Sequence, residues 1–439
     1  MSNQCIIRIG RELGEIQKSS DLSIAVACRD VDVRNVKAVI IGPPDTPYEF
    51  GFFEFALKFS KEYPERAPSV TATTTNGGRC RFNPNIYASG KVCLSILGTW
   101  RGERGEEWSS AQGLESILIS IQSLMSANPY ENEPGFEDAK SDHDKKNTTE
   151  YIAKRLEEYL GINPDGTMQP RSARNEFYDT EQDDEADDTF PTFEPFKDLC
   201  KRRFLWYFDS YMDSITRSQS KHKDDQSFVK MPFECTGNGM DGKFRFSELE
   251  RRLKFIREVL DKETEDWASE GLIAKQRESG IAANLQRQFE QAVEAYKKDD
   301  SVTLDIELVN GNPFVWALTY FGRPMTNLDG GLFRVKISFS PRFPEEQPRV
   351  VFETAMFHHR ISRDGVLCYF PTRTEDVKAH LDAIIEALEE ESPPYDPRTT
   401  VNPEAAKLYW GTVDDRKNYN RRLRRAVQRS MEWVTASIQ

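Results

Sequence analysis

The stretch from Arg81 to Trp108, RFNPNIYASGKVCLSILGTWRGERGEEW, sets a single cysteine, Cys93, among turn-forming residues. The Asn-Pro-Asn triplet at 83–85 is typical of a turn, and the Ser-Gly pair at 89–90 is a second turn signal. So many turn-forming residues around one cysteine indicate that the loop fixes the position of its side chain, and that the cysteine is not simply packed in the core. The sequence therefore indicates a thiol displayed on a rigid loop, with the side-chain amide of Asn85 nearby.

This stretch resembles the active site of ubiquitin-conjugating enzymes. The resemblance rests on the triplet at 83–85, on Cys93 eight residues after Asn85, and on the Trp-Ser pair at 108–109. Those enzymes usually have His-Pro-Asn where this chain has Asn83 first. That variant, followed by KVCLSILGTW at 91–100, is similar to the Z-type conjugating enzymes in particular, and the similarity runs from about Gln4 to about Trp267.

A free thiol is partly thiolate at neutral pH and is already a good nucleophile. Exchange of one thioester for another needs little driving force, and an amide donor beside the sulfur can stabilise the oxyanion that forms. The resemblance implies that Cys93 carries ubiquitin or a ubiquitin-like protein as a thioester, received from an activating enzyme. We expect Asn85 to donate to the oxyanion or to brace the loop.

The acceptor in such a reaction is an amine of a protein substrate, normally a protonated lysine. A carboxylate beside the thioester can orient the lysine, and partial desolvation lowers the pKa of the amine. The resemblance implies that this carboxylate is Glu133, in the loop NPYENEPGFE at 128–137, where the family more often has Asp. A solvated loop acid is the competing interpretation of Glu133.

Two other interpretations compete for Cys93. The first is an ordinary core cysteine, because free cysteines are often buried. The second is a thiol protease, which requires a histidine base. The first histidine of the chain is His143, outside the proposed catalytic core, so the protease interpretation is poorly supported.

The composition limits the class of protein. The 439 residues carry a net charge of -13 with 38% hydrophobic and 30% charged residues, which favours two or three soluble domains and disfavours non-specific nucleic-acid binding. No apolar run is long enough to span a bilayer, and the N-terminus does not read as a signal peptide. Seven scattered cysteines without a CxxC pair fit a reducing compartment and argue against a structural zinc site. We expect a cytoplasmic or nuclear protein with no metal or cofactor.

The order of the elements predicts the fold of the first 147 residues. The sequence predicts an amphipathic helix over 4–17, then strands over 24–28, 36–41, 51–59 and from 69, and a buried helix over 110–125. A helix, four strands, a loop and a helix make an α+β layer, in the order of the conjugating-enzyme core.

The middle of the chain, residues 148–279, is expected to be a helical extension. Helices are predicted over 148–160, 190–215 and 244–267, and the acidic run DTEQDDEADD at 179–188 is typical of a solvated or disordered linker. The region resembles the C-terminal extension of the Z-type enzymes, and we expect it to pack on or extend the first domain.

The chain then repeats itself with an offset of 280 residues. Gly42 and the Gly-Phe-Phe triplet at 51–53 recur as Gly322 and the Gly-Leu-Phe triplet at 331–333, and no gap is needed as far as Pro348. Beyond that point the second copy is five residues shorter. We expect a second, divergent conjugating-type domain over 280–439, with a leading helix at 281–296 and a helix at 376–388.

The second copy keeps a cysteine but alters its surroundings. Cys368 matches Cys93, Arg360 matches Asn85, and Asp396 stands where the family's gating acid would be. Two interpretations stay open, a second active thiol or a degenerate module used for binding. The neighbouring pair at 358–359 is interpreted as core or surface histidines and not as a metal site, because neighbours on a strand face opposite ways.

The sequence gives few indications of which surfaces bind partner proteins. In the family the activating enzyme binds the first helix, here with Arg8, Arg11 and Glu12, although these residues are also typical of an ordinary solvated face. Glu65 and Glu345 replace the apolar residue that many members use to contact ubiquitin ligases, which makes conventional ligase docking doubtful. The arginines at 421–429 are interpreted as a helix face.

The sequence therefore predicts a tandem ubiquitin-conjugating enzyme with two domains of that type. The alternative is a non-catalytic scaffold with two conjugating-like folds that recruits partners.

Overall fold

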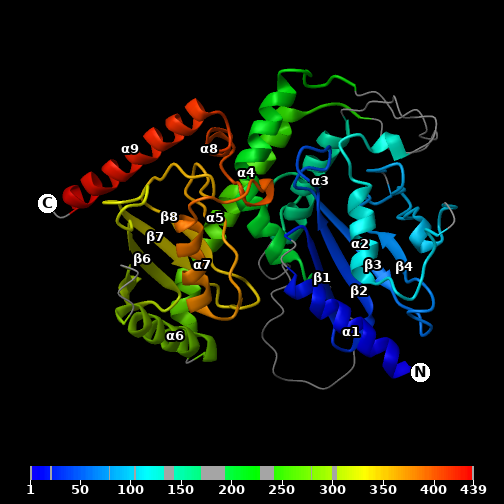
Figure 1. Cartoon of the computed structure of the whole chain (residues 1–439), viewed down its shortest axis with the longest axis horizontal. Helices are drawn as coiled ribbons and strands as arrows, with labels where there is room; N and C mark the ends of the chain where they lie inside the picture. Colours follow the sequence, from blue (N-terminus) through cyan, green and yellow to red (C-terminus); the bar gives the residue numbers. More distant parts are fainter. Residues whose placement is uncertain are drawn as a thin grey trace. The chain divides into compact units, whose positions relative to one another are not determined.

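The computed structural model describes residues 2–437 except 20–21, 79, 103–104, 133–142, 170–192, 228–241, 278 and 299–303. The chain divides into two compact units, Met1–Cys200 with Ile215–Ile256, and Lys201–Ser214 with Arg257–Gln439. Each unit contains one four-stranded antiparallel sheet, so the fold is α+β, as expected (Figure 1). The acidic run at 179–188 lies outside the described residues. Within the described part of the chain, no helix is both long and apolar enough to cross a membrane.

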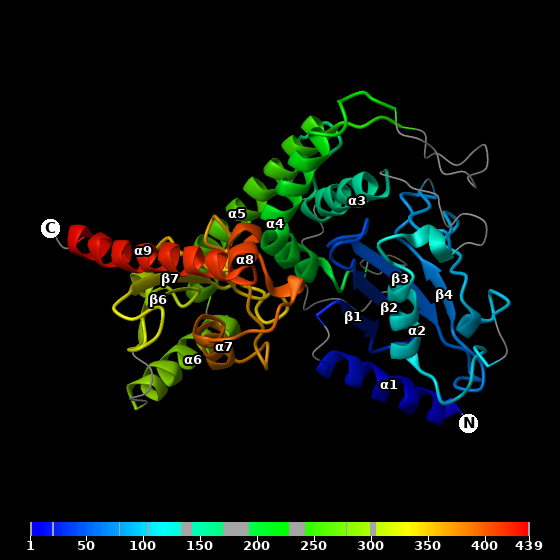
Figure 2. The same ribbon diagram turned by 45° about the horizontal axis from the view of Figure 1, so that its top comes forward.

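The first unit has the predicted element order. Helix α1 (Ser2–Lys18) precedes a meander of β1 (Ile24–Arg29), β2 (Asp32–Ile41), β3 (Phe52–Lys58) and β4 (Ser69–Ala72), which pair in that sequence. A short helix η1 (Ser95–Leu97), α2 (Leu114–Ser123) and η2 (Pro129–Asn132) follow. Helix α2 lies across one face of the sheet (Figures 1 and 2).

Periodic apolar residues explain these positions. Helix α1 buries Ile9, Leu13 and Ile16, which recur at helical spacing, while α2 buries four residues on one side. These side chains meet the aromatic residues of β3 in one apolar cluster. The cluster fixes the sheet beneath α2 and so provides a rigid base for the loops that follow β4.

The other face of this sheet is covered through a charged contact. Glu54 on β3 is buried and accepts from Arg155 of α3 (His143–Leu160), with 2.9 Å between Arg155 Nε and Glu54 Oε1. Arg155 also pairs with Glu194 at 2.6 Å, and Tyr159 donates to Glu54 at 3.3 Å. Helix α3 and Glu194 therefore pack on this face of the first sheet.

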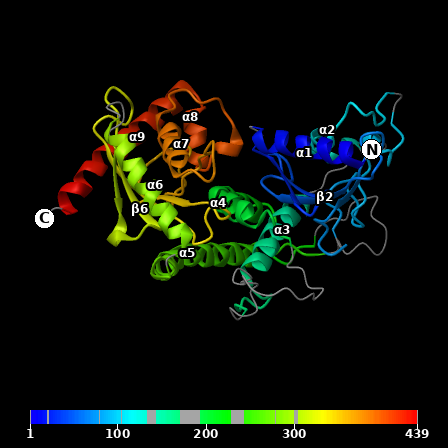
Figure 3. The same ribbon diagram turned by 90° about the horizontal axis from the view of Figure 1, so that it is seen from below.

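Two long helices of the extension are shared between the units. Helix α4 (Lys197–Gln219) contributes residues 201–214 to the second unit, and α5 (Phe246–Gln276) contributes everything from Arg257 onward. The two helices lie side by side (Figures 2 and 3), and buried Lys201 of α4 pairs with Glu263 of α5 at 2.6 Å. The domain boundaries at 147/148 and 279/280 stay predictions. The two compact units instead divide the chain within α4 and within α5.

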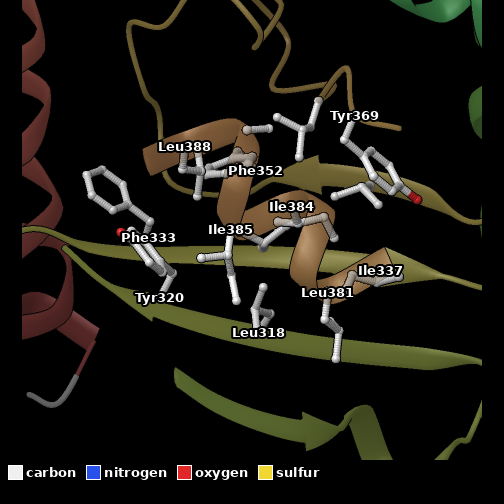
Figure 4. Close-up of a cluster of buried hydrophobic side chains, with 14 of the residues drawn as sticks. Leu318, Tyr320, Phe333, Ile337, Phe352, Tyr369, Leu381, Ile384, Ile385 and Leu388 are labelled. Atoms are coloured by element: carbon white, nitrogen blue, oxygen red, sulfur yellow. The ribbon is translucent and has the colours of Figure 1, made fainter. Parts of the chain in front are cut away.

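The second unit repeats the architecture of the first. Its elements are α6 (Gly280–Lys297), β5 (Leu304–Leu308), η4 (Val309–Gly311), β6 (Val315–Phe321), β7 (Leu332–Ser338), β8 (Arg349–Phe352), α7 (Val377–Glu389), η5 (Pro397–Thr399), α8 (Pro403–Tyr409) and α9 (Val413–Ser437). The strands pair in the order β5-β6-β7-β8. Figure 4 shows α7 crossing the sheet, with Leu381, Ile384 and Leu388 in the same buried cluster as Leu318 and Phe352.

The strand positions confirm the offset of 280 residues. Strand β3 at Phe52–Lys58 corresponds to β7 at Leu332–Ser338, and β4 at Ser69–Ala72 corresponds to β8 at Arg349–Phe352. Past β8 the isolated bridge between Ile86 and Val92 corresponds to the bridge between Ile361 and Leu367, which confirms the five-residue shortening.

Candidate active site

The turn residues before Cys93 form a small hairpin. The N–H of Cys93 donates to the carbonyl oxygen of Asn85 at 2.8 Å, and the N–H of Tyr87 donates to the carbonyl of Lys91 at 2.9 Å. The turn closes with Gly90 N–H donating to Tyr87 at 2.9 Å. The two residues singled out for chemistry therefore face each other across the open end of this hairpin.

Gly90 locks the hairpin onto the sheet. Its φ of 88° lies in the left-handed region, and its carbonyl accepts the N–H of Ala72 on β4 at 2.8 Å. A Cβ at this position would lie 2.7 Å from the carbonyl oxygen of Ala72, too close for any side chain. Glycine is required here because the hairpin backbone approaches the strand directly.

Asn83 braces the other end of the hairpin. Its side chain is fully buried, and its Nδ2 donates to the hydroxyl of Tyr48 at 3.0 Å and to the carbonyl of Leu124 at 2.8 Å. Its Oδ1 accepts the N–H of Asn85 at 2.8 Å. One amide thus connects the active-site loop to the loop before β3 and to the end of α2.

Thr99 holds the backbone on both sides of Cys93. Its hydroxyl donates to the carbonyl of Val92 at 2.6 Å and accepts the N–H of Leu94 at 3.0 Å. The peptide units that flank the cysteine are therefore tied to one side chain, which limits how far Cys93 can shift along the loop.

Cys93 is buried, with 3% of its surface exposed, but it is not a member of the apolar cluster of the first unit. Asn85 is 8% exposed, and its Oδ1, a hydrogen-bond acceptor, is buried without a partner among the residues that the structure describes. A buried acceptor without a partner is unusual in a folded protein.

The proposed gating acid, Glu133, lies outside the described residues. The preceding helix η2 ends at Asn132, and its Tyr130 is buried. The role of Glu133 therefore stays a prediction of the sequence.

The first helix differs from the expected solvated face. Arg11 is exposed, but Glu12 is only 5% exposed. Its Oε2 accepts the hydroxyl of Tyr63 at 2.6 Å and the N–H of Leu114, the first residue of α2, at 2.9 Å. Arg8 completes the group with a contact to Glu12 Oε1. The expectation was wrong for Glu12 because that carboxylate caps the N-terminus of α2.

The second copy reproduces the hairpin. The N–H of Cys368 donates to the carbonyl of Arg360 at 2.9 Å, and Gly365 has a φ of 87°. His358 takes the place of Asn83, since its Nδ1 accepts the N–H of Arg360 at 3.2 Å. The backbone hydrogen bond at the second cysteine is therefore the same as that at Cys93, although two imidazoles and a guanidinium replace the Asn-Pro-Asn side chains.

The other two candidates of the second copy are engaged in ion pairs. Arg360 Nη2 donates to Glu390 at 2.8 Å, and Asp396 accepts from the backbone and guanidinium of Arg398 at 2.9 and 3.0 Å. Burial raises the pKa of Asp396, but the hydrogen bonds from Arg398 outweigh burial and hold this pKa below its usual range. Asp396 is therefore an anion bound to a neighbour.

Cys368 itself is completely buried. Burial raises the pKa of its thiol to about 12, and the nearby Arg203 and Arg360 reduce this shift only in part. At neutral pH the Cys368 side chain is a neutral thiol, which is a poor nucleophile.

The two neighbouring histidines do not lie on a strand, so the prediction that their side chains face opposite ways is wrong. His358 and His359 lie in a loop and turn, and their rings stack at a centroid distance of 4.3 Å. Both are buried, and burial lowers the pKa of His358 to about 3 and the pKa of His359 further. Among the described residues no group of three metal-ligating side chains occurs. The pair is therefore a neutral, stacked part of the core.

Sequence reasoning missed three positioning residues. Asn83 and Thr99 carry a local signal, because each is a short polar side chain beside a turn, where such residues bond to nearby backbone. Glu12 carries no such signal, since its partners lie 51 and 102 residues away in the chain.

Comparisons with known proteins agree with these observations. A family model described as ubiquitin-conjugating enzyme matches residues 8–159 and 284–427. The chain is 38% identical over 255 residues to "Ubiquitin-conjugating enzyme E2 Z" of Homo sapiens, covering 58% of this chain and 63% of that protein. It is 50% identical over 151 residues to the Xenopus tropicalis protein of the same name, covering 34% of this chain and 47% of that protein. The chain thus spans less than two thirds of the length of these relatives.

Among solved structures, "Structure of human Ubiquitin-conjugating enzyme E2 G1" matches with 32% identity and a TM-score of 0.25. The match covers 28% of this chain and 96% of that one.

Proposed function

The chain belongs to the ubiquitin-conjugating enzyme family, and on this premise we propose that its first domain carries ubiquitin, or a related modifier, on Cys93. The observation that supports this most is the hydrogen bond from the Cys93 N–H to the Asn85 carbonyl, which brings the Cys93 and Asn85 side chains to the open end of a braced hairpin. The partners would be an activating enzyme, a protein substrate and, for some substrates, a ligase.

In the loading step, the Cys93 thiolate attacks the carbonyl carbon of the modifier's C-terminal thioester. The new carbon–sulfur bond forms as the bond to the activating enzyme's sulfur breaks, and that sulfur leaves as a thiolate. In the transfer step, the amine of a substrate attacks the same carbon, loses a proton and releases Cys93. The side-chain amide of Asn85 would donate to the oxyanion of each tetrahedral intermediate.

A charging assay tests this proposal. The full chain is incubated with activating enzyme, ATP and modifier, and the products are separated without reductant. The wild-type chain should form a conjugate that a thiol reductant removes, and Cys93→Ser should form an oxyester that resists the reductant. Cys28→Ser is the matched control, because Cys28 is a free, half-buried cysteine on β1 of the same unit.

The alternative is a scaffold without catalysis. It predicts that neither cysteine forms a thioester with any activating enzyme and modifier pair. A reducible conjugate that persists in Cys93→Ser would also refute the assignment of the carrier.

A further inference from the structure

Helix α4 contacts the cysteine hairpin of the second domain. Within the second unit, Oδ2 of Asp209 accepts the backbone N–H of Arg363 at 2.9 Å. Both carboxylate oxygens of Asp213, one turn further along α4, accept from the guanidinium of Arg363 at 3.1 Å. Two acids of one helix thus hold the turn between Arg360 and Cys368. One carboxylate accepts from the backbone N–H of Arg363, and the other accepts from the Arg363 guanidinium.

Tyr207 joins the same helix to the loop that contains Asp396. The Tyr207 side chain is completely buried, and its hydroxyl donates to the carbonyl of Arg398 at 2.7 Å. Arg203, one turn earlier, donates to that hydroxyl at 3.3 Å. The hydroxyl is therefore satisfied as donor and acceptor, which a buried tyrosine requires.

A third contact covers the chain just after the cysteine. The rings of Trp206 and Phe370 meet edge to face at a centroid distance of 5.3 Å. The guanidinium of Arg203 lies 4.8 Å from the ring of Trp206 and 5.3 Å from the ring of Phe370. Helix α4 therefore touches the segments before, after and opposite Cys368.

These contacts leave no approach to the sulfur. The Cys368 side chain is completely buried, and Trp206 and Arg203 of α4 cover Phe370, two residues after it. An acyl group would have to replace buried aromatic and charged side chains that are already satisfied, and the remaining partners would then be left unpaired. The surface that resembles a carrier site is filled by a segment of the same chain.

We propose that the second domain is a receptor for helix α4: its Cys368 face binds this helix and accepts no acyl group in the intact chain. This goes beyond the function proposed for Cys93, and it selects the binding module over the second active thiol. The helix is anchored by the buried hydroxyl of Tyr207 and by the two acids that hold Arg363.

Alkylation of the full chain tests the proposal without any modifier. Iodoacetamide is added at pH 8, and the rate at each cysteine is read by mass spectrometry. With a thiol pKa of about 12 against a usual value of 9.0, the native thiolate fraction is roughly 1000-fold smaller. We expect Cys368 to react at least 100-fold more slowly in the native chain than in guanidinium chloride. Native labelling within threefold of the denatured rate would overturn the proposal.

Variants of α4 should release the cysteine. Tyr207→Ala should raise the native labelling rate of Cys368 at least tenfold. Ser210→Ala, a change at a half-buried position of the same helix, should leave this rate unchanged. Hydrogen exchange of β6 and β7 reports unfolding of the second unit, to which Tyr207 and Cys368 belong. If Tyr207→Ala also raises exchange in these strands, the milder Arg363→Ala decides, because it removes the Asp213 ion pair and should raise Cys368 labelling alone. An unchanged rate in both variants contradicts the proposal.

A charging assay gives the second test. The Cys93→Ala chain, which keeps Cys368, should form no reducible conjugate, and Cys368→Ala should charge at the wild-type rate. A conjugate of Cys93→Ala that disappears in the double variant would overturn the receptor role. The function proposed for Cys93 fails separately, through absence of charging in the Cys368→Ala chain.

Discussion

The side-chain oxygen of Asn83 accepts the backbone N–H of Asn85 at 2.8 Å. In the second copy the ring nitrogen Nδ1 of His358 accepts the N–H of Arg360 at 3.2 Å. An amide and an imidazole thus perform the same task, because each offers one acceptor two residues before the braced N–H. The hydrogen bond to Asn83 uses only the backbone N–H of Asn85, so it does not engage the Asn85 side chain.

Replacing Asn83 tests this brace. Asn83→Ala leaves the Tyr48 hydroxyl, the Leu124 carbonyl and the Asn85 N–H without their buried partner. We expect the free energy of unfolding of the first unit to fall by about 2–4 kcal/mol, measured by urea denaturation. The rate of thioester formation should fall with it.

The control for Asn83 is Tyr48→Phe, which removes one of the three contacts and should cost about 1 kcal/mol. Equal losses in the two variants would show that the bonds of Asn83 to Leu124 and Asn85 together contribute nothing to stability. Asn83→His should retain more charging than Asn83→Ala, since His358 already braces the second hairpin.

Asn85→Ala separates catalysis from stability. Within the described part of the chain the Asn85 side-chain oxygen has no hydrogen-bond partner, while the Asn85 backbone makes the contacts to Cys93 and Asn83. We therefore expect transfer from the thioester to free lysine to slow by about 10²–10³-fold, as for loss of an oxyanion donor. The free energy of unfolding should change by less than about 1 kcal/mol.

Asn85→Asp is the matched variant, because it keeps the shape and loses the N–H donor. It should lose as much transfer activity as Asn85→Ala. If stability and transfer fall together in both variants, Asn85 is a structural brace instead.

Thr99→Val tests the tie around Cys93. The valine keeps the shape of threonine and removes the hydroxyl that binds Val92 and Leu94. We expect single-turnover charging to slow several-fold, with a loss of stability of about 1 kcal/mol because Thr99 is exposed. Thr99→Ser restores the hydroxyl and should restore the charging rate. Wild-type charging by Thr99→Val would remove Thr99 from the positioning residues.

His358→Asn tests the pH dependence of the second domain. Burial, with a smaller effect of Arg360, lowers the pKa of His358 from 6.5 to about 3. Between these values the unfolded chain binds the proton and the folded chain does not, so stability is present above pH 6.5 and is lost as the pH falls. At pH 5 this single group accounts for about 2 kcal/mol.

The variant removes this titration and keeps a side-chain acceptor for Arg360. Hydrogen-exchange mass spectrometry of residues 350–370 measures the local stability at pH 7 and pH 5. We expect the wild-type chain to lose more protection than His358→Asn on going to pH 5. Equal losses in the two chains would contradict the lowered pKa of His358.

Local signals predicted the framework well. The alternation of apolar residues in β3 and the glycine pair at 42 and 51 recur 280 residues later because both copies build the same meander. The turn chemistry at 83–85 and 89–90 predicted two turns and a rigid loop, since a few adjacent residues determine such turns; that these turns form a hairpin came from the structure. Helix bounds were less accurate: α3 begins at His143 and not at Thr148, and α4 runs from Lys197 to Gln219 instead of 190–215.

The sequence by itself determined which sulfurs and amides belong to the two hairpins, because those contacts lie within about ten residues. Only the tertiary structure decided what surrounds them. Asp209 meets Arg363 from 154 positions away, and Glu12 meets Leu114 from 102 positions away. Periodicity describes which face of an element is apolar, but it does not state which distant element covers that face. For this reason Cys93 and Cys368 look alike in the sequence, while the structure shows helix α4 packed against the hairpin of Cys368.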